Sequence, residues 1–381
     1  MKKTIIYTGP FMMPDKNAAA HRVLNNAKIF RKLGYDVVFL GINGEADSNY
    51  ENTYFTHDGF DIYEIRCSSP VDKMKKLTEC VELKKLIDKY DACGVVAYDY
   101  YATGLGAIRK ICRKRGIKFF ADSDEWFGFT GSNFVDKLIR WGDSQLRMRI
   151  MLPKVDGLIV ISSFLKDYYK NRVNTVCVPP LTDLTDKKWE HNGSKTLSDC
   201  LEFAYAGSPG KSKDKINRII ECLALYEEQR FSFKVVGISK EQYLRYYPEH
   251  QGLIEKLGDK VEFKGRQPHL TTLEYIKNAD FMMFYREITR VTKAGFPTKF
   301  VEGVSCGTPI ITNETSDLKN YLKDGVNGIT IKGCDISDMK NAFDKVFGMS
   351  KEELAGMKKV CFEQRNTFHY ENYVDEIEKL F

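Results

Sequence analysis

The chain has 381 residues, a length that suits two domains of roughly 180 residues better than one core. Hydrophobic residues make up 43% and charged residues 29%, which excludes a disordered chain. No apolar run reaches the ~18 residues that a membrane-spanning helix needs. The net charge of +6 is mild and includes short basic clusters such as residues 109–118, RKICRKRGIK. Such clusters indicate solvated helix faces or attraction to an anionic membrane or ligand.

A nucleic-acid partner is not expected, because the chain has no zinc-finger spacing, RNA-binding aromatic signature or long basic tract. Its ten cysteines form no C-x-x-C pair and have no histidine at metal-ligand spacing. Scattered thiols of this kind favour a reducing compartment. Since Met1 leads directly into a predicted strand, no signal peptide is expected. The predicted location is cytoplasmic, with peripheral contact at the inner face of the membrane as an option.

The first half of the chain alternates short β-branched and aromatic runs with longer helical patterns. Its predicted strands are 4–9, 36–41, 60–66, 94–98, 118–122, 157–162 and 173–179. The pattern of residues 19–34 predicts a helix, because Val23, Ala27, Phe30 and Leu33 fall on one face. Gly34 is placed to close that helix.

The second half repeats this alternation and ends in an amphipathic stretch. Its predicted strands are 201–207, 231–237, 261–265, 281–285, 308–312 and 327–331, and a helix is predicted over 370–381. Strand–helix alternation predicts an α/β fold with parallel sheets buried on both faces. Two such sets predict two Rossmann-like domains. In such sheets, ligands bind beyond the carboxyl ends of the strands.

The predicted domain boundaries follow from a polar, weakly periodic stretch after Pro179. The predicted division is an amino-terminal acceptor-binding domain, a linker, a carboxy-terminal nucleotide-sugar domain and a terminal helix, over 1–180, 181–199, 200–365 and 366–381.

The strongest motif is the segment 293–318. Gly295 ends a loop, Pro297 suits the first turn of a helix, and Gly307 is placed to cap that helix near Cys306. A glycine loop that opens a helix presents free N–H groups to a phosphate, and Glu302 would then reach both ribose hydroxyls of a nucleotide. The alternative is a plain turn with a surface glutamate, and the spacing alone favours neither.

The stretch GFPTKFVEGVSCGTPII, beginning at Gly295, resembles the donor-binding motif of retaining GT-B glycosyltransferases of family 4. Three further stretches resemble that family in order, beginning at Ala18, Val155 and Leu201. The resemblance implies a GT-B fold, two domains facing across a cleft, and a terminal helix that crosses back to the first domain. It implies transfer of a sugar from a UDP- or GDP-sugar to a glycan or lipid-linked acceptor in bacterial surface polysaccharide synthesis, without a required metal or other cofactor.

The resemblance also assigns donor-site residues in the second domain. From the motif these are Gly295, Phe296, Pro297, Thr298, Lys299 and Glu302. The loop that begins at Gly207, itself a donor-binding residue, supplies cations to the donor diphosphate. Lys213 matches the family lysine, and Lys211 is its neighbour. Arg286 is a further candidate cation, and His269 lies where the family approaches the nucleobase.

In the first domain, the resemblance and the strand ends indicate the acceptor-binding residues Gly9, His21, Asp122 and Glu125. With Asp124, the two acidic residues offer metal binding as an alternative to acceptor binding or local capping. Asp99 follows the fourth predicted parallel strand and is the nearest titratable group, so it is the catalytic candidate together with Lys213. The family chemistry needs no enzymatic base, because the leaving phosphate can accept the acceptor proton.

Two residues depart from the family pattern. Ala294 stands where the family has a glutamate that contacts the donor sugar, and Ser208 stands where it has an arginine. The motif therefore predicts the nucleotide better than the sugar. These departures leave open a non-catalytic GT-B partner subunit that binds nucleotide sugar and assists an active transferase. Another GT-B enzyme, such as a nucleotide-sugar epimerase, is a third reading.

Overall fold

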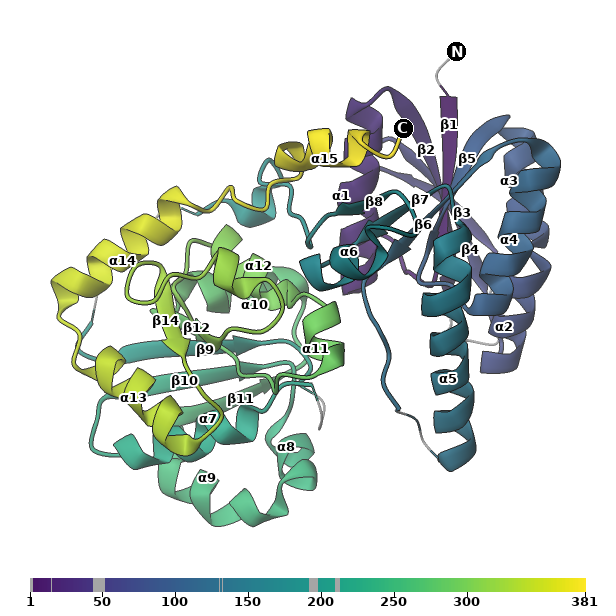
Figure 1. Ribbon diagram of the computed structural model, residues 1–381. Coiled ribbons are helices and arrows are strands. Elements are labelled where there is room, and N and C mark those ends of the chain that lie inside the picture. Colours follow the sequence, from purple (N-terminus) through teal and green to yellow (C-terminus); the bar gives the residue numbers. More distant parts are fainter. Residues whose placement is uncertain are drawn as a thin grey trace. The chain divides into compact units, whose positions relative to one another are not determined.

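The structure is a computed structural model that describes residues 3–14, 16–43, 52–129, 131, 133–191, 198–209 and 213–381. Its contacts divide the chain into two compact units (Figure 1). Unit 1 consists of Met1–Leu181, Ala294–Phe296 and Tyr370–Phe381. Unit 2 consists of Thr182–Lys293 and Pro297–His369.

Unit 1 contains an eight-stranded sheet with the order β3-β4-β2-β1-β5-β6-β7-β8. The strands are β1 Lys3–Gly9, β2 Tyr35–Asn43, β3 Thr53–His57, β4 Phe60–Arg66, β5 Ala92–Tyr98, β6 Lys118–Ser123, β7 Gly157–Val160 and β8 Thr175–Cys177. All neighbours pair in parallel except β3 and β4, which form an antiparallel hairpin. The apolar strands β1 and β5 lie at the centre, as expected for burial on both faces.

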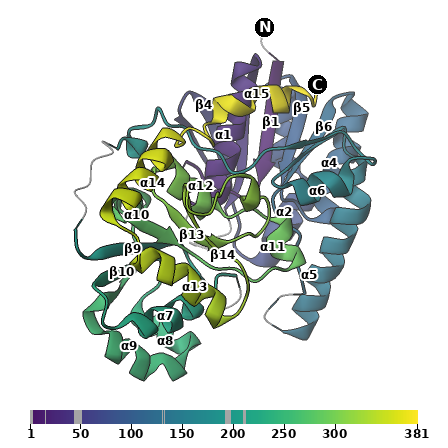
Figure 2. The same ribbon diagram turned by 60° about the vertical axis from the view of Figure 1, so that its left-hand side comes forward.

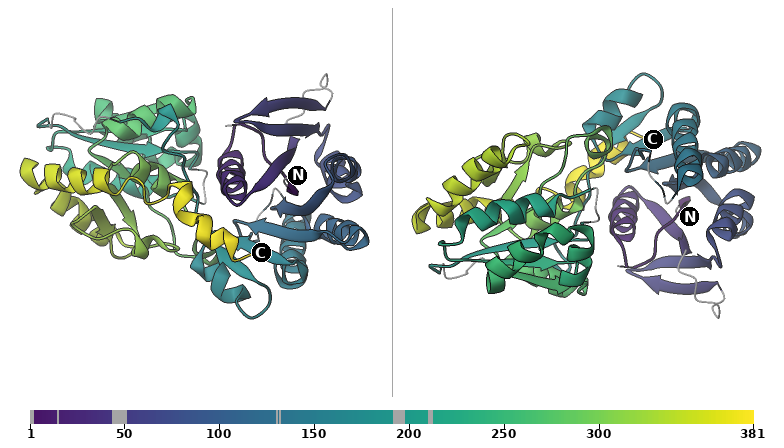
Figure 3. Two further views of the ribbon diagram at one scale, coloured as in Figure 1. Left: turned by 90° about the horizontal axis from the view of Figure 1, so that it is seen from above. Right: turned by 90° about the horizontal axis from the view of Figure 1, so that it is seen from below.

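The helices of unit 1 cover both faces of this sheet (Figure 3). They are α1 Ala18–Lys32, α2 Pro70–Glu79, α3 Val81–Lys89, α4 Ala102–Arg115, α5 Phe134–Leu146, α6 Ser163–Tyr169 and α15 Val374–Glu378. A π-helical turn, Arg147–Met151, continues α5. The connection from β1 leads to β2 on one side, whereas the connections after β4 and β5 lead towards the other side of the sheet. Right-handed crossovers therefore place α1 on one face and α3 and α4 on the other.

The predicted first helix is confirmed, with its ends set by local chemistry. The Asn17 side chain accepts a hydrogen bond from the Ala20 N–H at 2.9 Å and caps the start. Gly34 has a φ of +88°, the left-handed conformation that glycine adopts after a helix. Val23, Ala27 and Phe30 are fully buried and join the core of unit 1.

The end of the chain belongs to the core of unit 1. Tyr370, Ile377 and Leu380 are buried there, and the Phe381 ring stacks on Tyr35 with 4.7 Å between centroids. The predicted single helix over 370–381 is instead a 3-10 turn, Tyr370–Tyr373, followed by the short α15.

Unit 2 contains a six-stranded, wholly parallel sheet with the order β11-β10-β9-β12-β13-β14. The strands are β9 Leu201–Ala206, β10 Phe231–Val236, β11 Val261–Gly265, β12 Phe281–Met283, β13 Ile310–Asn313 and β14 Gly328–Ile331. The helices are α7 Ile216–Leu223, α8 Lys240–Tyr246, α9 Gln251–Leu257, α10 His269–Asn278, α11 Arg290–Ala294, α12 Thr298–Ser305, α13 Ile336–Phe347 and α14 Lys351–Glu363. Helices α10, α12 and α14 gather on one face of the sheet, and α7 and α13 lie on the other (Figure 2).

Each of the thirteen predicted strands is present, within three residues at either end, and the predicted α/β fold is confirmed. The hairpin strand β3 was missed, because its exposed alternation at a sheet edge resembles a polar connection. The contact division falls between Leu181 and Thr182. Within the predicted linker, Trp189 is buried and Thr182 pairs with Phe368, so residues 182–191 pack in unit 2.

Among the described residues, no helix combines the length and apolarity needed to cross a bilayer. All ten cysteines lie in the described part of the chain, and none forms a disulfide. Burial raises the pKa of several of these thiols, including Cys80 to about 11. They therefore act as small apolar core residues.

Ile377→Ala is expected to lower the free energy of unfolding of unit 1 by about 2–4 kcal/mol, because the side chain is fully buried in its core. Urea unfolding followed by circular dichroism measures the change. The control is Ile336→Ala, at a position that is 41% exposed, where little change is expected. Equal effects of the two changes would contradict the burial of the chain terminus.

Candidate functional site

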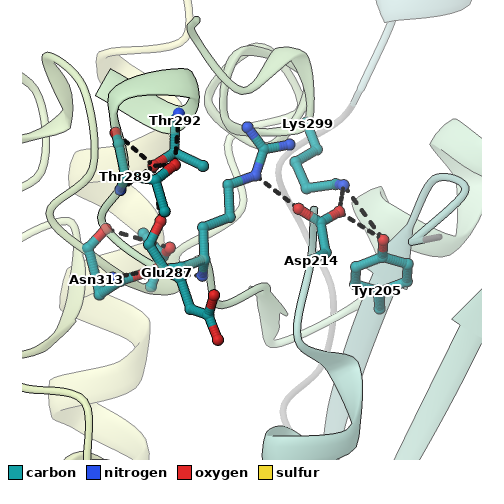
Figure 4. Close-up of polar contacts among 9 residues, drawn as sticks. Tyr205, Asp214, Glu287, Thr289, Thr292, Lys299 and Asn313 are labelled. Carbon is teal, nitrogen blue, oxygen red and sulfur yellow. Dashed lines mark hydrogen bonds and ion pairs between the residues drawn. The ribbon is translucent and has the colours of Figure 1, made fainter. Parts of the chain in front are cut away.

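A buried carboxylate holds several side chains together where the strands of the unit 2 sheet end. Asp214 is 1% exposed and accepts a hydrogen bond from the Tyr205 hydroxyl at 2.7 Å. It also accepts one from Nε of Arg286 at 2.6 Å and forms an ion pair with Nζ of Lys299. Figure 4 shows Tyr205 and Lys299 converging on this carboxylate. We call these four residues the Asp214 cluster.

Four separate elements bring the cluster together. Tyr205 lies near the end of β9, Asp214 lies two residues before α7, and Lys299 lies in the first turn of α12. Arg286 follows β12, and its backbone is held by Asn313 at the end of β13 through bonds of 3.1 and 2.7 Å. The cluster therefore lies where ligands bind in open α/β sheets.

The cluster contains two cations and one carboxylate, so one positive charge remains unbalanced. Burial raises the pKa of Asp214, but the charges of Lys299 and Arg286 outweigh burial and hold that pKa well below the ordinary value. Burial lowers the pKa of Lys299 and Arg286 assists this fall, whereas Asp214 and, to a smaller extent, the Glu302 carboxylate outside the cluster oppose it. A buried excess of positive charge is costly, and an anion bound beside it would reduce that cost.

Gly207, a predicted donor-binding residue, directly follows β9 beside the cluster. Its φ is +126°, and a Cβ atom there would lie 3.2 Å from Nζ of Lys299. A side chain at this position would therefore meet both an unfavourable backbone conformation and the ammonium group. Packing against Lys299 therefore explains why this position is a glycine, which the sequence did not reveal.

Glu302 and His269 lie together in unit 2. Their Oε1 and Nε2 atoms are 3.3 Å apart, and their side chains are 24% and 20% exposed. Glu302 comes from α12 and His269 begins α10. The Trp189 ring meets His269 edge-on, with 6.2 Å between centroids. The sequence named both residues as nucleotide contacts but did not predict that they would pair.

The remaining predicted donor residues differ in exposure. Pro297 caps α12, and Thr298, its first residue, is exposed. Gly295 is partly exposed, whereas Phe296 is buried, and both are grouped with unit 1 by their contacts. Lys213 is exposed and Lys211 lies outside the described residues.

Ala294 stands where the family pattern has a glutamate, and its side chain is fully buried. The nearest alternative carboxylate, Glu287, forms an ion pair with Lys215 at 3.2 Å. In Figure 4 its carboxylate points away from Asp214. Glu287 is therefore not placed to replace a glutamate at position 294.

In unit 1, Asp122 is buried and fully engaged. It accepts hydrogen bonds from the Tyr7 hydroxyl at 2.6 Å and from Asn26 at 3.1 Å, and Arg22 forms an ion pair with it at 2.6 Å. Burial raises the pKa of Asp122, and Arg22 opposes that rise. These bonds fasten α1 to the sheet and give Asp122 a structural role, while its acceptor-binding role stays a prediction.

Asp99 lies directly after β5 in a left-handed conformation, with φ of +48°. Its side chain is 15% exposed and forms an ion pair with Arg147, which also donates to the Glu125 carbonyl at 3.0 Å. Burial raises the pKa of Asp99 to about 7, opposed by Arg147 and assisted by Asp124 and Glu125. A carboxyl group with this pKa can exchange a proton near neutral pH.

The other acceptor candidates gather at the same edge of unit 1. Gly9 ends β1, and a Cβ atom there would lie 2.5 Å from the Tyr98 carbonyl oxygen, which explains the glycine by packing. His21 is partly exposed in the first turn of α1, and Asp124 accepts a hydrogen bond from the Tyr98 hydroxyl at 2.6 Å. Within the described residues, no group of three or more potential ligands has the geometry of a metal site.

Asp214→Asn is expected to lower the free energy of unfolding of unit 2 by about 3–5 kcal/mol, because two buried cations lose their carboxylate. The folded-state pKa of Asp214 is lowered, so its contribution is present above the ordinary value of 3.8 and is lost as the pH falls below it. The variant should therefore lose less stability than the parent on acidification. Urea unfolding at several pH values measures this difference, and the exposed Asp199→Asn serves as control. A matching loss in that control would contradict a special role for Asp214.

The Asp99 carboxyl carbon is expected to titrate near pH 7 in protein labelled with ¹³C at aspartate carboxyl groups. Arg147→Met should move this titration to higher pH, because it removes the charge that favours the carboxylate. Asp99→Asn identifies the resonance by its loss. A titration near pH 4 in the parent protein would be incompatible with the burial described.

Comparisons with known proteins give a family match within unit 2 and structural matches to the whole chain. Residues 202–359 match the family model described as glycosyl transferases group 1. A search of curated protein sequences finds no match. The solved structure of sucrose-phosphate synthase from Thermosynechococcus elongatus is similar, with 16% identity, a TM-score of 0.75, and coverage of 100% of this chain and 98% of that one.

Two other solved structures resemble the chain over almost its whole length. The lipopolysaccharide outer core galactosyltransferase WaaB has 15% identity and a TM-score of 0.65, covering 99% of this chain and 98% of that one. Anabaena Alr3699/HepE, solved with UDP and glucose, has 12% identity and a TM-score of 0.64, with the same coverage. Residues 202–359 are therefore a group 1 glycosyltransferase domain, and the chain has the two-domain fold of the GT-B glycosyltransferases.

Proposed function

We propose that this protein transfers a sugar from a nucleotide-diphosphate sugar to a glycan or lipid-linked acceptor. Transfer retains the anomeric configuration and contributes to a surface polysaccharide. In this proposal unit 2 binds the donor and unit 1 binds the acceptor. The observation that carries it is the unbalanced positive charge of the Asp214 cluster, inside the group 1 glycosyltransferase domain.

The diphosphate of the donor is the anion that would neutralise the positive charge of the Asp214 cluster. The α12 helix begins at Thr298 with no side-chain cap, and Lys299 is in its first turn. Helix N-termini attract phosphate through their N–H groups and through the helix dipole. Exposed Lys213, one residue before Asp214, supplies a further cation from the Gly207 loop.

Glu302 and His269 are the proposed contacts for the nucleoside. A carboxylate can accept hydrogen bonds from both ribose hydroxyls, and the neighbouring imidazole would orient that carboxylate or meet the base. Because HepE was solved with UDP, a UDP-sugar is the first donor to test, and a GDP-sugar is the second.

Charge stabilisation is the chemistry proposed for unit 2. Negative charge develops on the departing diphosphate, and Lys213 and the Asp214 cluster would stabilise it. These side chains supply the positive charge, so the proposal includes no metal cofactor. The leaving phosphate would accept the acceptor proton.

The proposed acceptor contacts in unit 1 are Gly9, His21 and Glu125, with Asp99 as the titratable group. A lipid-linked acceptor would bring the protein to the inner face of the membrane. The proposed location is therefore cytoplasmic and peripheral to an anionic bilayer.

The second candidate is a non-catalytic partner subunit that binds nucleotide sugar and assists an active transferase. Ala294 favours it, because its buried methyl group cannot contact a sugar hydroxyl as the family glutamate does. Ser208 adds to this, since it replaces a cation on the diphosphate loop. This candidate predicts nucleotide binding without turnover.

Glu302→Gln is expected to weaken UDP binding at least tenfold, because a neutral amide accepts weaker hydrogen bonds from the ribose than a carboxylate does. Titration calorimetry with UDP measures the affinity. Glu228→Gln, at an exposed position of unit 2, is the matched control and should bind as the parent does. The donor-site assignment fails if the parent protein binds neither UDP nor GDP.

Turnover separates the two candidate functions. Purified protein is incubated with UDP-glucose, UDP-galactose and GDP-mannose, and release of the nucleotide is measured with and without a lipid-linked acceptor. Release that depends on Lys213 supports the transferase. Tight binding without release from any donor supports the partner subunit.

A further inference from the structure

Helix α5 in unit 1 exposes a row of large apolar side chains. Phe134 is 70% exposed, Ile139 64% and Leu138 50%. The exposed apolar residues of the helix are Phe134, Val135, Leu138, Ile139, Trp141 and Leu146. Figure 1 shows the first turns of α5 extending beyond the other helices of unit 1.

These residues form one continuous face. At about 100° per residue they fall within an arc of roughly 160° around the helix axis. The opposite face is polar and is directed at unit 1: Asp143 accepts the Ala102 N–H at 2.8 Å, and the Ser144 hydroxyl donates to the Phe127 carbonyl at 3.2 Å. Ser144 is the only buried residue in α5. An ordinary surface helix has the reverse arrangement, with its apolar face on the core.

The preceding loop extends this surface. Phe129 is 49% exposed, and its ring meets that of Phe134 edge-on with 6.1 Å between centroids. We define the α5 face as Phe129, Phe134, Val135, Leu138, Ile139 and Trp141. Contiguous exposed apolar surface of this kind indicates a binding partner.

Charge identifies the kind of partner. Residues 1–181 contain 28 Lys and Arg and 21 Asp and Glu, a net charge of +7, so the remaining residues have a net charge of −1. Lys137, at the polar border of the α5 face, is partly exposed. Arg149, just beyond α5, is also exposed. A second copy would present the same positive domain and repel it, whereas an anionic bilayer offers both an apolar interior and opposite charge.

We propose that the α5 face binds the surface of an anionic phospholipid bilayer, with its aromatic and aliphatic side chains at the boundary between headgroups and acyl chains. The polar side of the helix remains on unit 1. This proposal rests on the peripheral membrane contact proposed above. It adds that α5 makes the contact and that the lipid is anionic. Its test needs no transfer activity.

Tryptophan fluorescence provides a direct test with the full chain. Of its three tryptophans, Trp126 and Trp189 are 3% exposed, whereas Trp141 on the α5 face is 41% exposed. Vesicles of equal parts phosphatidylglycerol and phosphatidylcholine are expected to shift the emission to shorter wavelength and to carry the protein into the pellet. Vesicles of phosphatidylcholine alone should bind it at least tenfold more weakly. In Trp141→Phe the spectral shift should disappear while sedimentation with vesicles continues.

A double change, Leu138→Glu with Ile139→Glu, should reduce partitioning into anionic vesicles at least tenfold, since it places two charges on the face. Both positions are exposed, and unchanged circular dichroism would show that the fold is kept. The control is Leu225→Glu in unit 2, at a position that is 58% exposed, which should partition as the parent does.

Three results would overturn the proposal. The double variant could partition as strongly as the parent, or neutral and anionic vesicles could bind equally well. Sedimentation could instead reveal a dimer that the double variant dissociates, which would assign the face to a second copy. Calorimetry with UDP in the absence of lipid tests the donor site separately, so failure at the membrane leaves that result intact.

Discussion

Unit 2 of this protein depends on one buried carboxylate. Asp214 fixes Lys299 on α12, Arg286 after β12 and Tyr205 on β9, so a single side chain sets the relation of three elements at one sheet edge. It neutralises only one of the two cations, because a carboxylate carries one charge. The same interaction therefore stabilises unit 2 and leaves a positive site that suits a diphosphate. Gly207 belongs to this constraint, since the space of its missing side chain lies beside Lys299.

Unit 1 also contains buried charged side chains, but there each carboxylate pairs with one cation. Asp122 and Arg22 are both buried and matched one to one, and they join α1 to the sheet. In the second pair, Asp99 with Arg147, burial and then the nearby acidic residues raise the pKa of Asp99 towards neutrality. The first pair is placed for stability, whereas the second keeps a titratable group at the edge where ligands bind. Both units thus have paired charges at strand ends, but only the Asp214 cluster has more cations than carboxylates.

The sequence predicted the fold well because hydrophobic periodicity reports burial directly. The continuous apolar runs gave the parallel strands, and Gly34 and Gly307 marked helix ends through their left-handed backbones. The Asp214 cluster was predicted only in part: Arg286 and Lys299 were named as cations, but their carboxylate lies 72 and 85 residues away in the chain. The burial of Asp122 was not predicted for the same reason, since its partner Arg22 is 100 residues distant. The polar half-buried strand β3 and the outward apolar face of α5 also follow from tertiary context, which periodicity alone does not contain.

The central claim is that the excess charge of the Asp214 cluster binds the diphosphate of a nucleotide sugar. The most direct measurement compares UDP with uridine, and GDP with guanosine, by calorimetry in the parent protein and in Lys299→Gln. The account predicts that a diphosphate tightens binding strongly in the parent, that added salt weakens this gain, and that Lys299→Gln loses most of it. A nucleoside that binds the parent as tightly as its diphosphate would contradict the account.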